Sequence, residues 1–157
     1  MKSDDIEILK NVDCPLKETI ISLIEKHATR DGKSNVDKEL ALTRIYSPHK
    51  YNLPDFEPYI DWVHTLGFSE KRAEPSMVWG LTYIGDDFTY PHDHNPYRIT
   101  GIHYLRAEEG CGLLQFPETV IEPEEDMIVT APGWKMHSVL PAENPEARRT
   151  CIVFNLL

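Results

Sequence analysis

The chain has 157 residues, a formal net charge of −10 and 41% hydrophobic residues, which suits one globular domain of ordinary composition. The acidic balance and the lack of a basic run argue against nucleic-acid binding, and no apolar stretch approaches the roughly 18 residues of a membrane span. The start, "MKSDDIEILK", has no apolar signal core and the three cysteines are unclustered, so we expect a reduced, cytoplasmic protein.

The first 70 residues are predicted to be mainly helical. In "PLKETIISLIEKHATRDG", apolar residues recur at steps of three and four from Leu16 to Ile24, which is typical of an amphipathic helix. Gly32 suits the end of this helix. The segment "VDKELALTRIY" predicts a second short helix, and "LPDFEPYIDWVHTLGF" predicts a third helix that stops at Gly67.

From Ser76 the pattern changes to short segments rich in β-forming residues. "SMVWGLTYI" alternates, and it is followed by "YRITGIHYL", "GLLQF", "MIVTA", "HSVL" and "RRTCIVFNLL". Each segment is bounded by Gly, Pro, Asp or Glu, as strands are. The pattern predicts a mainly β single domain over residues 1–157, in which residues 1–70 form a helical support and residues 76–157 form a β-sandwich or barrel.

Two histidines in "YPHDH" are candidate metal ligands. Alternate residues of a strand point to the same side, so His92 and His94 would aim at one point while Asp93 faces away. His137 in "APGWKMHSVLP" follows a Pro-Gly turn and could bring a third imidazole from another strand. Imidazole suits iron, zinc, copper and nickel, and three protein ligands leave positions open for a substrate. An H-x-H pair by itself would fit a polar loop equally well.

An arginine at the start of the last strand is a candidate anion site. Arg149 would share a strand face with Cys151, whereas Arg148 faces the other way. A guanidinium inside a barrel needs an anion, and a 2-oxo acid could place its far carboxylate there while its other end binds the metal. The alternative is a strand-start arginine that pairs with Glu146 on the surface.

Taken together, these segments resemble the double-stranded β-helix (jelly-roll, cupin-like) core of the Fe(II)/2-oxoglutarate-dependent oxygenases. "WGLTYIGDDFTYPHDH" resembles the family's Trp…Tyr…Gly…His-x-Asp/His segment, and "RITGIHYL" resembles its strand ending in Tyr-Leu. "APGWKMHSVLP" is similar to the Pro-x-x-x-x-His-x-Val turn, and "RRTCIVFN" to the closing Arg-x-Ser-Ile-x-Phe-Asn strand. Within that superfamily the chain looks like the prolyl-hydroxylase-like enzymes and small bacterial and phage oxygenases with an H-x-H pair.

The resemblance implies that His92 and His137 are iron ligands and that His94 stands where the family usually has Asp. A carboxylate there would lower the +2 charge at the metal, whereas a neutral imidazole does not. Three histidines resemble instead the metal site of cupin-type thiol dioxygenases. A further alternative is that His94 is not a ligand, and that water or an anion fills its position.

The other matched residues concern the cosubstrate and the substrate. Arg149 would anchor the 5-carboxylate of 2-oxoglutarate, and strand phase favours it over Arg148, although the loop "AENPEA" before them is longer than usual. The resemblance implies that Tyr83 and Tyr104 line the cosubstrate pocket and that Arg98 lies near the substrate mouth.

The activity implied by the resemblance is an oxygenase that uses Fe(II), 2-oxoglutarate and O2 to hydroxylate a C–H bond of a small-molecule or peptide substrate. Nucleic acid and membrane are not expected partners. One alternative is a three-histidine cupin-like dioxygenase or lyase without 2-oxoglutarate, although "NPYRITG" lacks the Glu that usually follows H-x-H in cupins. Another is a non-catalytic binding module. The sequence leaves the substrate and the oligomeric state open.

Overall fold

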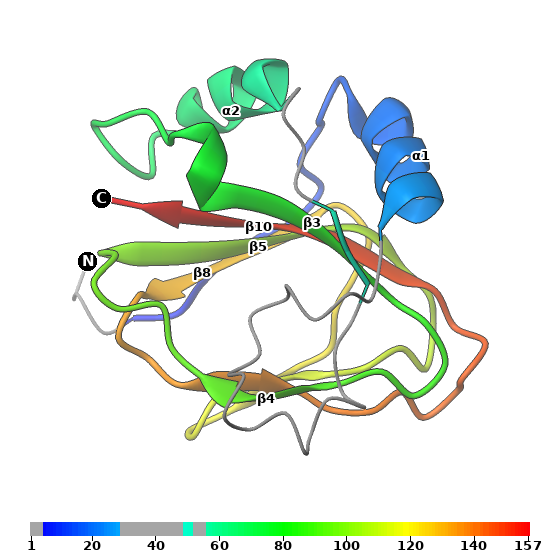
Figure 1. Cartoon of the computed structure of the whole chain (residues 1–157). Coiled ribbons are helices and arrows are strands. Elements are labelled where there is room, and N and C mark those ends of the chain that lie inside the picture. The colour runs from blue at the N-terminus through cyan, green and yellow to red at the C-terminus, as the bar shows by residue number, and fades with distance from the viewer. Residues whose placement is uncertain (1–4, 29–48, 52–55) are drawn as a thin grey trace.

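The architecture consists of two facing antiparallel sheets with helices on one outer side, as given by a computed structural model that describes residues 5–28, 49–51 and 56–157 (Figure 1). The main sheet has the strand order β1-β8-β5-β10-β3-β2, and the minor sheet has the order β4-β9-β6-β7. The strands are β1 (Glu7–Leu9), β2 (His49–Tyr51), β3 (Val78–Tyr83), β4 (Thr89–His92), β5 (Ile99–Ala107), β6 (Leu114–Gln115), β7 (Val120–Ile121), β8 (Met127–Pro132), β9 (His137–Val139) and β10 (Arg149–Leu156).

The centre of the main sheet is buried on both faces. Every residue of β3 and of β10 is buried, because helices cover one face and the minor sheet covers the other (Figure 1). On the inner face, Leu81, Tyr104 and Cys151 pack with residues of the minor sheet, whereas Ile152 and Phe154 on the outer face pack against the helices. This double burial explains why both strands have apolar residues on both faces and, apart from Arg149, no charged residue.

The two α-helices of the described residues lie on the outer face of the main sheet (Figure 1). Helix α1 (Lys17–His27) buries Ile20, Ile21 and Ile24. A Cβ at Gly80 of β3 would lie 2.5 Å from Cγ1 of Ile24, so the glycine lets α1 approach the sheet closely. The predicted amphipathic stripe is thus confirmed for Ile20 and Ile24. Leu23, which was also expected on this stripe, is only partly buried, and Ile21 is buried instead.

The second described helix, α2 (Glu57–His64), buries Tyr59, Ile60 and Val63. It leads through a turn to Gly67, which has a φ of +81°, the left-handed conformation that favours glycine at a helix C-terminus. A short 3₁₀ helix, η2 (Pro75–Met77), precedes β3. The predicted helix in "VDKELALTRIY" and the predicted stop at Gly32 lie outside the described residues.

Two edge strands come from the part of the chain that the sequence predicted to be helical. Strand β1 pairs with β8 and strand β2 pairs with β3, each over three residues. The division of the chain into a helical support and a β core stays a prediction. The predicted fold class is confirmed, since the described chain is mostly antiparallel β with few helices and forms a jelly-roll core. None of its described helices has the length and apolar character needed to cross a membrane.

Candidate metal centre

Three histidines converge at one point in the cavity between the two sheets. The candidate ligand nitrogens of His92, His94 and His137 all lie within 4.8 Å of one another. The pairing of β4 with β9 sets His92 opposite His137, with ring centroids 4.5 Å apart. His94 follows β4 by two residues, and its ring centroid lies 4.9 Å from that of His137. The structure thus brings together the three histidines that the sequence singled out.

Main-chain carbonyl groups fix the tautomer of two of these histidines. The Nδ1–H of His92 donates to the carbonyl oxygen of Tyr90 (2.7 Å), and the Nδ1–H of His137 donates to that of Lys135 (3.0 Å). A carbonyl oxygen can only accept, so Nδ1 carries the proton and Nε2 presents its lone pair. Metal-binding histidines commonly donate their other ring N–H in this way, which orients the ring and raises its basicity.

Burial keeps the rings of His92 and His137 neutral. It lowers the pKa of His92, and burial together with the nearby His92 and His94 lowers the pKa of His137 to about 3. The neutral imidazole is the form that ligates a metal, so at neutral pH no proton has to leave these rings before an ion binds.

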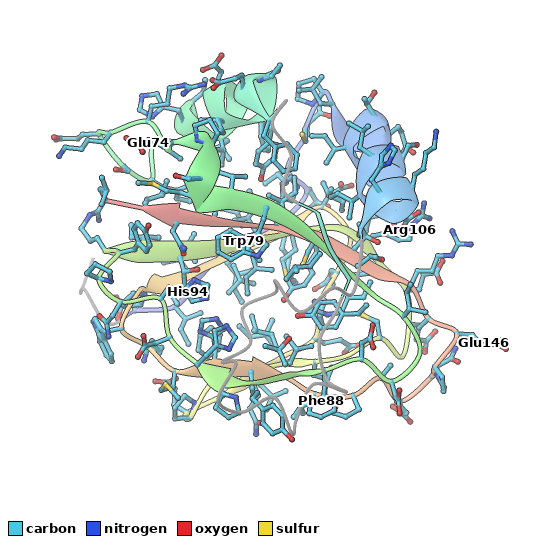
Figure 2. The ribbon with its side chains drawn as sticks, in the orientation of Figure 1. Glu74, Trp79, Phe88, His94, Arg106 and Glu146 are labelled. Carbon is cyan, nitrogen blue, oxygen red and sulfur yellow. The ribbon has the colours of Figure 1, made fainter. Side chains whose placement is uncertain are left out.

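His94 is held by the turn that follows β8. Its backbone N–H donates to the carbonyl oxygen of Gly133 (2.7 Å), and its own carbonyl oxygen accepts from the N–H of Tyr97 (2.9 Å). A Cβ at position 133 would overlap the carbonyl oxygen of Tyr97, so only glycine fits this turn. The His94 ring lies nearly parallel to the indole of Trp79, at 7° with centroids 6.0 Å apart, and Figure 2 shows the two side chains next to each other between the sheets.

The same cavity contains Arg149, which is only 1% exposed. Its guanidinium carbon lies 4.3 Å from the ring centroid of Tyr83 and 4.9 Å from that of Tyr104. Its Nε donates to the carbonyl oxygen of Gly112 (3.0 Å), and its Nη2 donates to the hydroxyl of Tyr104 (3.2 Å). None of the ion pairs found among the described residues involves Arg149. Among the described residues, the buried guanidinium of Arg149 therefore contacts only neutral groups.

The neighbouring Arg148 lies on the other side of β10. Its side chain is 63% exposed, and its Nη1 is 3.9 Å from a carboxylate oxygen of Glu25 on α1. The surface reading considered for Arg149, with Glu146 as partner, is wrong, because Arg149 lies inside the cavity. The strand phase inferred from the sequence is thus the observed one.

The walls around Arg149 are neutral as well. Burial raises the pKa of Tyr83 to about 12, and it raises the pKa values of Tyr104 and of Cys151, in each case against the opposing effect of the Arg149 charge. The phenols and the thiol therefore keep their protons at neutral pH. The rest of the lining is apolar and consists of Trp79, Leu81, Ile102, Val139 and Val153.

Two predicted site residues, Tyr104 and Arg98, are not among those that line this cavity. Tyr104 is fully buried behind Arg149 and contacts it through its hydroxyl and ring. Arg98 lies apart from the cavity. It is exposed just before β5, and its Nη2 donates to the carbonyl oxygen of Phe68 (3.2 Å). It borders a separate surface groove, together with Tyr97 and the exposed Trp134.

Two supporting groups were not assigned a role from the sequence. Gly133 holds the His94 loop, and its only sequence signal is the Pro-Gly turn before His137. The Gly112 carbonyl oxygen accepts a hydrogen bond from Arg149 Nε. No sequence signal marks it, because the contact joins residues 37 positions apart.

The fold is similar to that of solved oxygenase structures. Prolyl-4-hydroxylase from Pseudomonas putida matches with a TM-score of 0.67 at 14% identity, over 98% of this chain and 92% of that chain. HygX from Streptomyces hygroscopicus, with nickel and 2-oxoglutarate bound, matches with a TM-score of 0.65 at 12% identity, over 98% and 82%. A Trichoplax adhaerens prolyl hydroxylase, in complex with a hypoxia inducible factor peptide fragment, matches with a TM-score of 0.63 at 15% identity, over 96% and 83%.

At these identities the likeness concerns the fold, and it confirms the predicted resemblance at that level. No family model matches the sequence, and no curated protein matches it.

Proposed function

We propose that this protein is an Fe(II)- and 2-oxoglutarate-dependent oxygenase that hydroxylates a C–H bond. The observation that carries the proposal is one cavity with a three-imidazole cluster and a buried guanidinium that has no described anionic partner. The shared fold with HygX, whose structure contains nickel and 2-oxoglutarate, supports this assignment.

The donor set suits the metal. His92, His94 and His137 would hold Fe(II) through their ring nitrogens, since imidazole is a good ligand for iron and the three protein donors leave other positions open. When bound, iron and 2-oxoglutarate would supply the oxidising chemistry, in which O2 is consumed, succinate and CO2 are released, and a C–H bond is hydroxylated. The apolar walls keep water from this chemistry.

Arg149 would bind the far carboxylate of 2-oxoglutarate. A guanidinium pairs with a carboxylate through two parallel hydrogen bonds, and a buried cation without a counter-charge costs several kcal/mol. The neutral phenols of Tyr83 and Tyr104 flank the guanidinium and would contact the bound cosubstrate. The Tyr104 hydroxyl accepts from Arg149 and can donate its own proton to a carboxylate, so both charge and hydrogen bonding favour an anion at this end of the cavity.

The substrate would be a small molecule or a peptide. Proteins of similar fold have been solved with a hypoxia inducible factor peptide fragment and with hygromycin B. Arg98 would contact such a substrate from outside the cavity, in the groove that it shares with Trp134.

A second candidate is a three-histidine metalloenzyme that uses no 2-oxo acid. It is favoured by one observation, namely that the described metal-ligand cluster contains no carboxylate. It does not explain Arg149, however. Burying a guanidinium without an anion destabilises the fold, and such an enzyme would have no use for it.

The experiment that tests the proposal measures succinate formation by the iron-loaded protein, in air, with 2-oxoglutarate and a panel of candidate substrates. We expect succinate only when 2-oxoglutarate is present. Product formation without it would favour the second candidate, and failure to bind any metal would favour a non-catalytic module.

The matched variants are Arg149→Gln and Arg148→Gln. We expect Arg149→Gln to weaken 2-oxoglutarate binding at least about thirtyfold, the lower end for the loss of a buried charged contact, and to leave metal affinity intact. Arg148→Gln alters only an exposed residue and should change neither affinity. Equal 2-oxoglutarate affinity in the two variants would contradict the role proposed for Arg149.

A further inference from the structure

Two polar side chains are buried on the inner face of the main sheet. Thr100 on β5 is 3% exposed, and Asn155 on β10 is 5% exposed. The hydroxyl oxygen of Thr100 and Oδ1 of Asn155 form no hydrogen bond with any group in the described part of the chain. An unpaired buried polar group destabilises a fold, so most such groups are paired, and these two oxygens call for an explanation.

The two side chains are neighbours and continue the wall of the histidine cavity. The pairing of β5 with β10 sets Thr100 opposite Asn155. Because alternate residues of a strand share a face, Thr100 points to the same side as Ile102, and Asn155 points to the same side as Val153. Ile102 and Val153 line the cavity. Thr100 and Asn155 therefore lie one two-residue step beyond it, roughly 7 Å along the strands, on the side away from Arg149.

The same pair lies beside the surface groove that contains Arg98 and Trp134. Thr100 follows Ile99 in β5 and is paired with Ala131 of β8. Both Ile99 and Ala131 line this groove. The two polar groups thus lie between the metal centre and the groove, whereas the proposed anchor of the cosubstrate is at the opposite end of β10. This part of the inner face is left for the substrate.

We propose that Thr100 and Asn155 form a substrate subsite that binds a neutral amide. This inference rests on the proposed function and specifies its substrate class. Asn155 Oδ1 can only accept, so it needs an N–H or O–H donor, and the Thr100 hydroxyl can donate to a carbonyl oxygen. An amide offers the donor and the acceptor on separate atoms, as two side chains on neighbouring strands require.

Both side chains are uncharged, so they favour a neutral group, since a charged one would lose its hydration without gaining a counter-charge there. Two sources share the amide chemistry. One is a peptide bond, which is a secondary amide, and the other is a primary carboxamide of a small molecule or side chain.

The first test compares Thr100→Val with Thr82→Val in the ligand-free protein. Thr82 is also buried, but its hydroxyl bonds that of Thr150 (3.0 Å). We expect Thr100→Val to raise Tm by about 2–4 °C, because it removes an unpaired hydroxyl, and Thr82→Val to lower Tm by a similar amount. An equal loss in both variants would show that the Thr100 hydroxyl is already bonded, for instance to a buried water, and would overturn the inference.

The second test measures amide binding to the full-length protein loaded with zinc(II), which has no redox chemistry. The NH2 group of Asn155 and the methyl group of Thr100 are followed by NMR. N-methylacetamide represents a peptide bond and acetamide a primary carboxamide, and we expect saturable shifts of both signals, with the tighter probe identifying the source. N,N-dimethylacetamide has no N–H for Asn155 and should bind about two- to twelvefold more weakly than N-methylacetamide.

The variants for this second test change one hydroxyl. Thr100→Val should weaken binding of the tighter amide by about two- to twelvefold, the effect of one lost hydrogen bond, as followed at the Asn155 signal. Thr100→Ser keeps the hydroxyl and should bind within about twofold of the unmodified protein. Signals that neither amide shifts, or equal affinities in Thr100→Val and the unmodified protein, would contradict the subsite.

Failure of this inference and failure of the proposed function are distinguishable, because neither test needs 2-oxoglutarate. If 2-oxoglutarate binds the metal-loaded protein and neither amide shifts the two signals, the inference is wrong and the function stands. If an amide binds at Thr100 and Asn155 but 2-oxoglutarate does not bind the protein, the proposed reaction is wrong and the amide subsite remains.

Discussion

Arg149 makes different contacts with the two phenols beside it. The Tyr104 hydroxyl accepts from Nη2 of Arg149, whereas the Tyr83 hydroxyl bonds to Oγ1 of Thr89 and contacts the guanidinium only through its ring. The two tyrosines are thus similar in burial and distance but differ in the hydrogen bond that orients the cation.

We therefore predict that Tyr104→Phe lowers 2-oxoglutarate affinity by roughly two- to twelvefold, the effect of one lost hydrogen bond of about 0.5–1.5 kcal/mol. Tyr83→Phe should change that affinity less than twofold, because its hydroxyl does not bond Arg149. Calorimetric titration of the metal-loaded variants checks both values. A larger loss in Tyr83→Phe than in Tyr104→Phe would contradict this division of roles.

The local sequence was sufficient to identify the candidate ligand residues, but not the way in which the fold brings them together. His92 and His94 do aim at one centre as expected, but the strand period of two is not the reason, because β4 ends at His92 and His94 lies in the following loop. Strand phase correctly predicted that Arg149, rather than Arg148, faces the cavity. The opposition of His92 and His137 depends on pairing between β4 and β9, which no local pattern encodes. The roles of these residues in iron and cosubstrate binding stay predictions.

At the scale of elements, the turn between β8 and β9 positions the His94 loop. Gly133 accepts from the His94 N–H, and its own N–H donates to the carbonyl oxygen of Arg98 (3.0 Å). Because a side chain at position 133 would overlap the carbonyl of Tyr97, the loop and the turn fit together only with glycine there.

Gly133→Ala is predicted to displace His94 and to weaken metal binding at least tenfold, besides lowering stability by about 1–3 kcal/mol through steric overlap. Gly67→Ala is the matched control. It adds the same methyl group at a left-handed position with open space around it and outside the lining of the histidine cavity, so it should lower stability without changing metal affinity. Metal titration and thermal unfolding of both variants provide the check, and unchanged metal affinity in Gly133→Ala would refute this function of the turn.

A second element contact joins α2 to the outer face of β5. His103 is fully buried, its Nδ1 bonds the hydroxyl of Tyr59 (2.9 Å), and its ring stacks on those of Tyr59 and Trp62. Burial lowers the pKa of His103 to about 4 from an ordinary value of 6.5, and the distant charges of Asp126 and Lys17 have smaller, opposing effects.

The pKa of His103 predicts a pH-dependent loss of stability. Between pH 6.5 and 4 the unfolded chain holds a proton on this imidazole that the folded chain does not. The contribution of His103 to the free energy of unfolding is therefore complete above pH 6.5. It falls as the pH drops toward 4, by up to about 3 kcal/mol.

The control is His103→Asn, whose amide can replace Nδ1 toward Tyr59 but does not titrate. Denaturant unfolding across this pH range should show a shallower loss for the variant, since all other titrating groups are the same in both proteins. If the free energy of unfolding fell equally with pH in both proteins, His103 would not be responsible for the loss of stability.

Elements with strong local patterns were predicted best. The described helices α1 and α2 follow apolar spacing, and the central strands follow runs of β-forming residues. Strands β1 and β2 were missed because three residues give no periodicity, and they are strands only through pairing with β8 and β3.

In the whole molecule, the proposed site connects the two sheets. The histidines come from β4, β9 and the loop after β4, while Arg149 belongs to β10 in the main sheet. A metal ion with 2-oxoglutarate would therefore tie the two layers together in the folded state only, and ligands that bind only the folded state stabilise it.

We predict that a metal ion at a hundred times its dissociation constant stabilises the protein by about 2.7 kcal/mol, a rise of roughly 5–10 °C in Tm for a chain of this size. A chelator should reverse the rise. His137→Ala should abolish it, whereas His64→Ala, which alters an exposed histidine of α2, should keep it. Anaerobic thermal melts with Fe(II) or cobalt(II) measure the effect, and an undiminished rise in His137→Ala would exclude this ligand.

The central claim is that the histidine cluster and Arg149 together form a site for a metal-bound 2-oxo acid. The most direct measurement is calorimetric titration of 2-oxoglutarate into the protein under anaerobic conditions, with and without Fe(II). We predict saturable binding of one equivalent that requires the metal and that Arg149→Gln weakens at least about thirtyfold. Absence of binding in the presence of the metal, or equal binding without it, would contradict the claim.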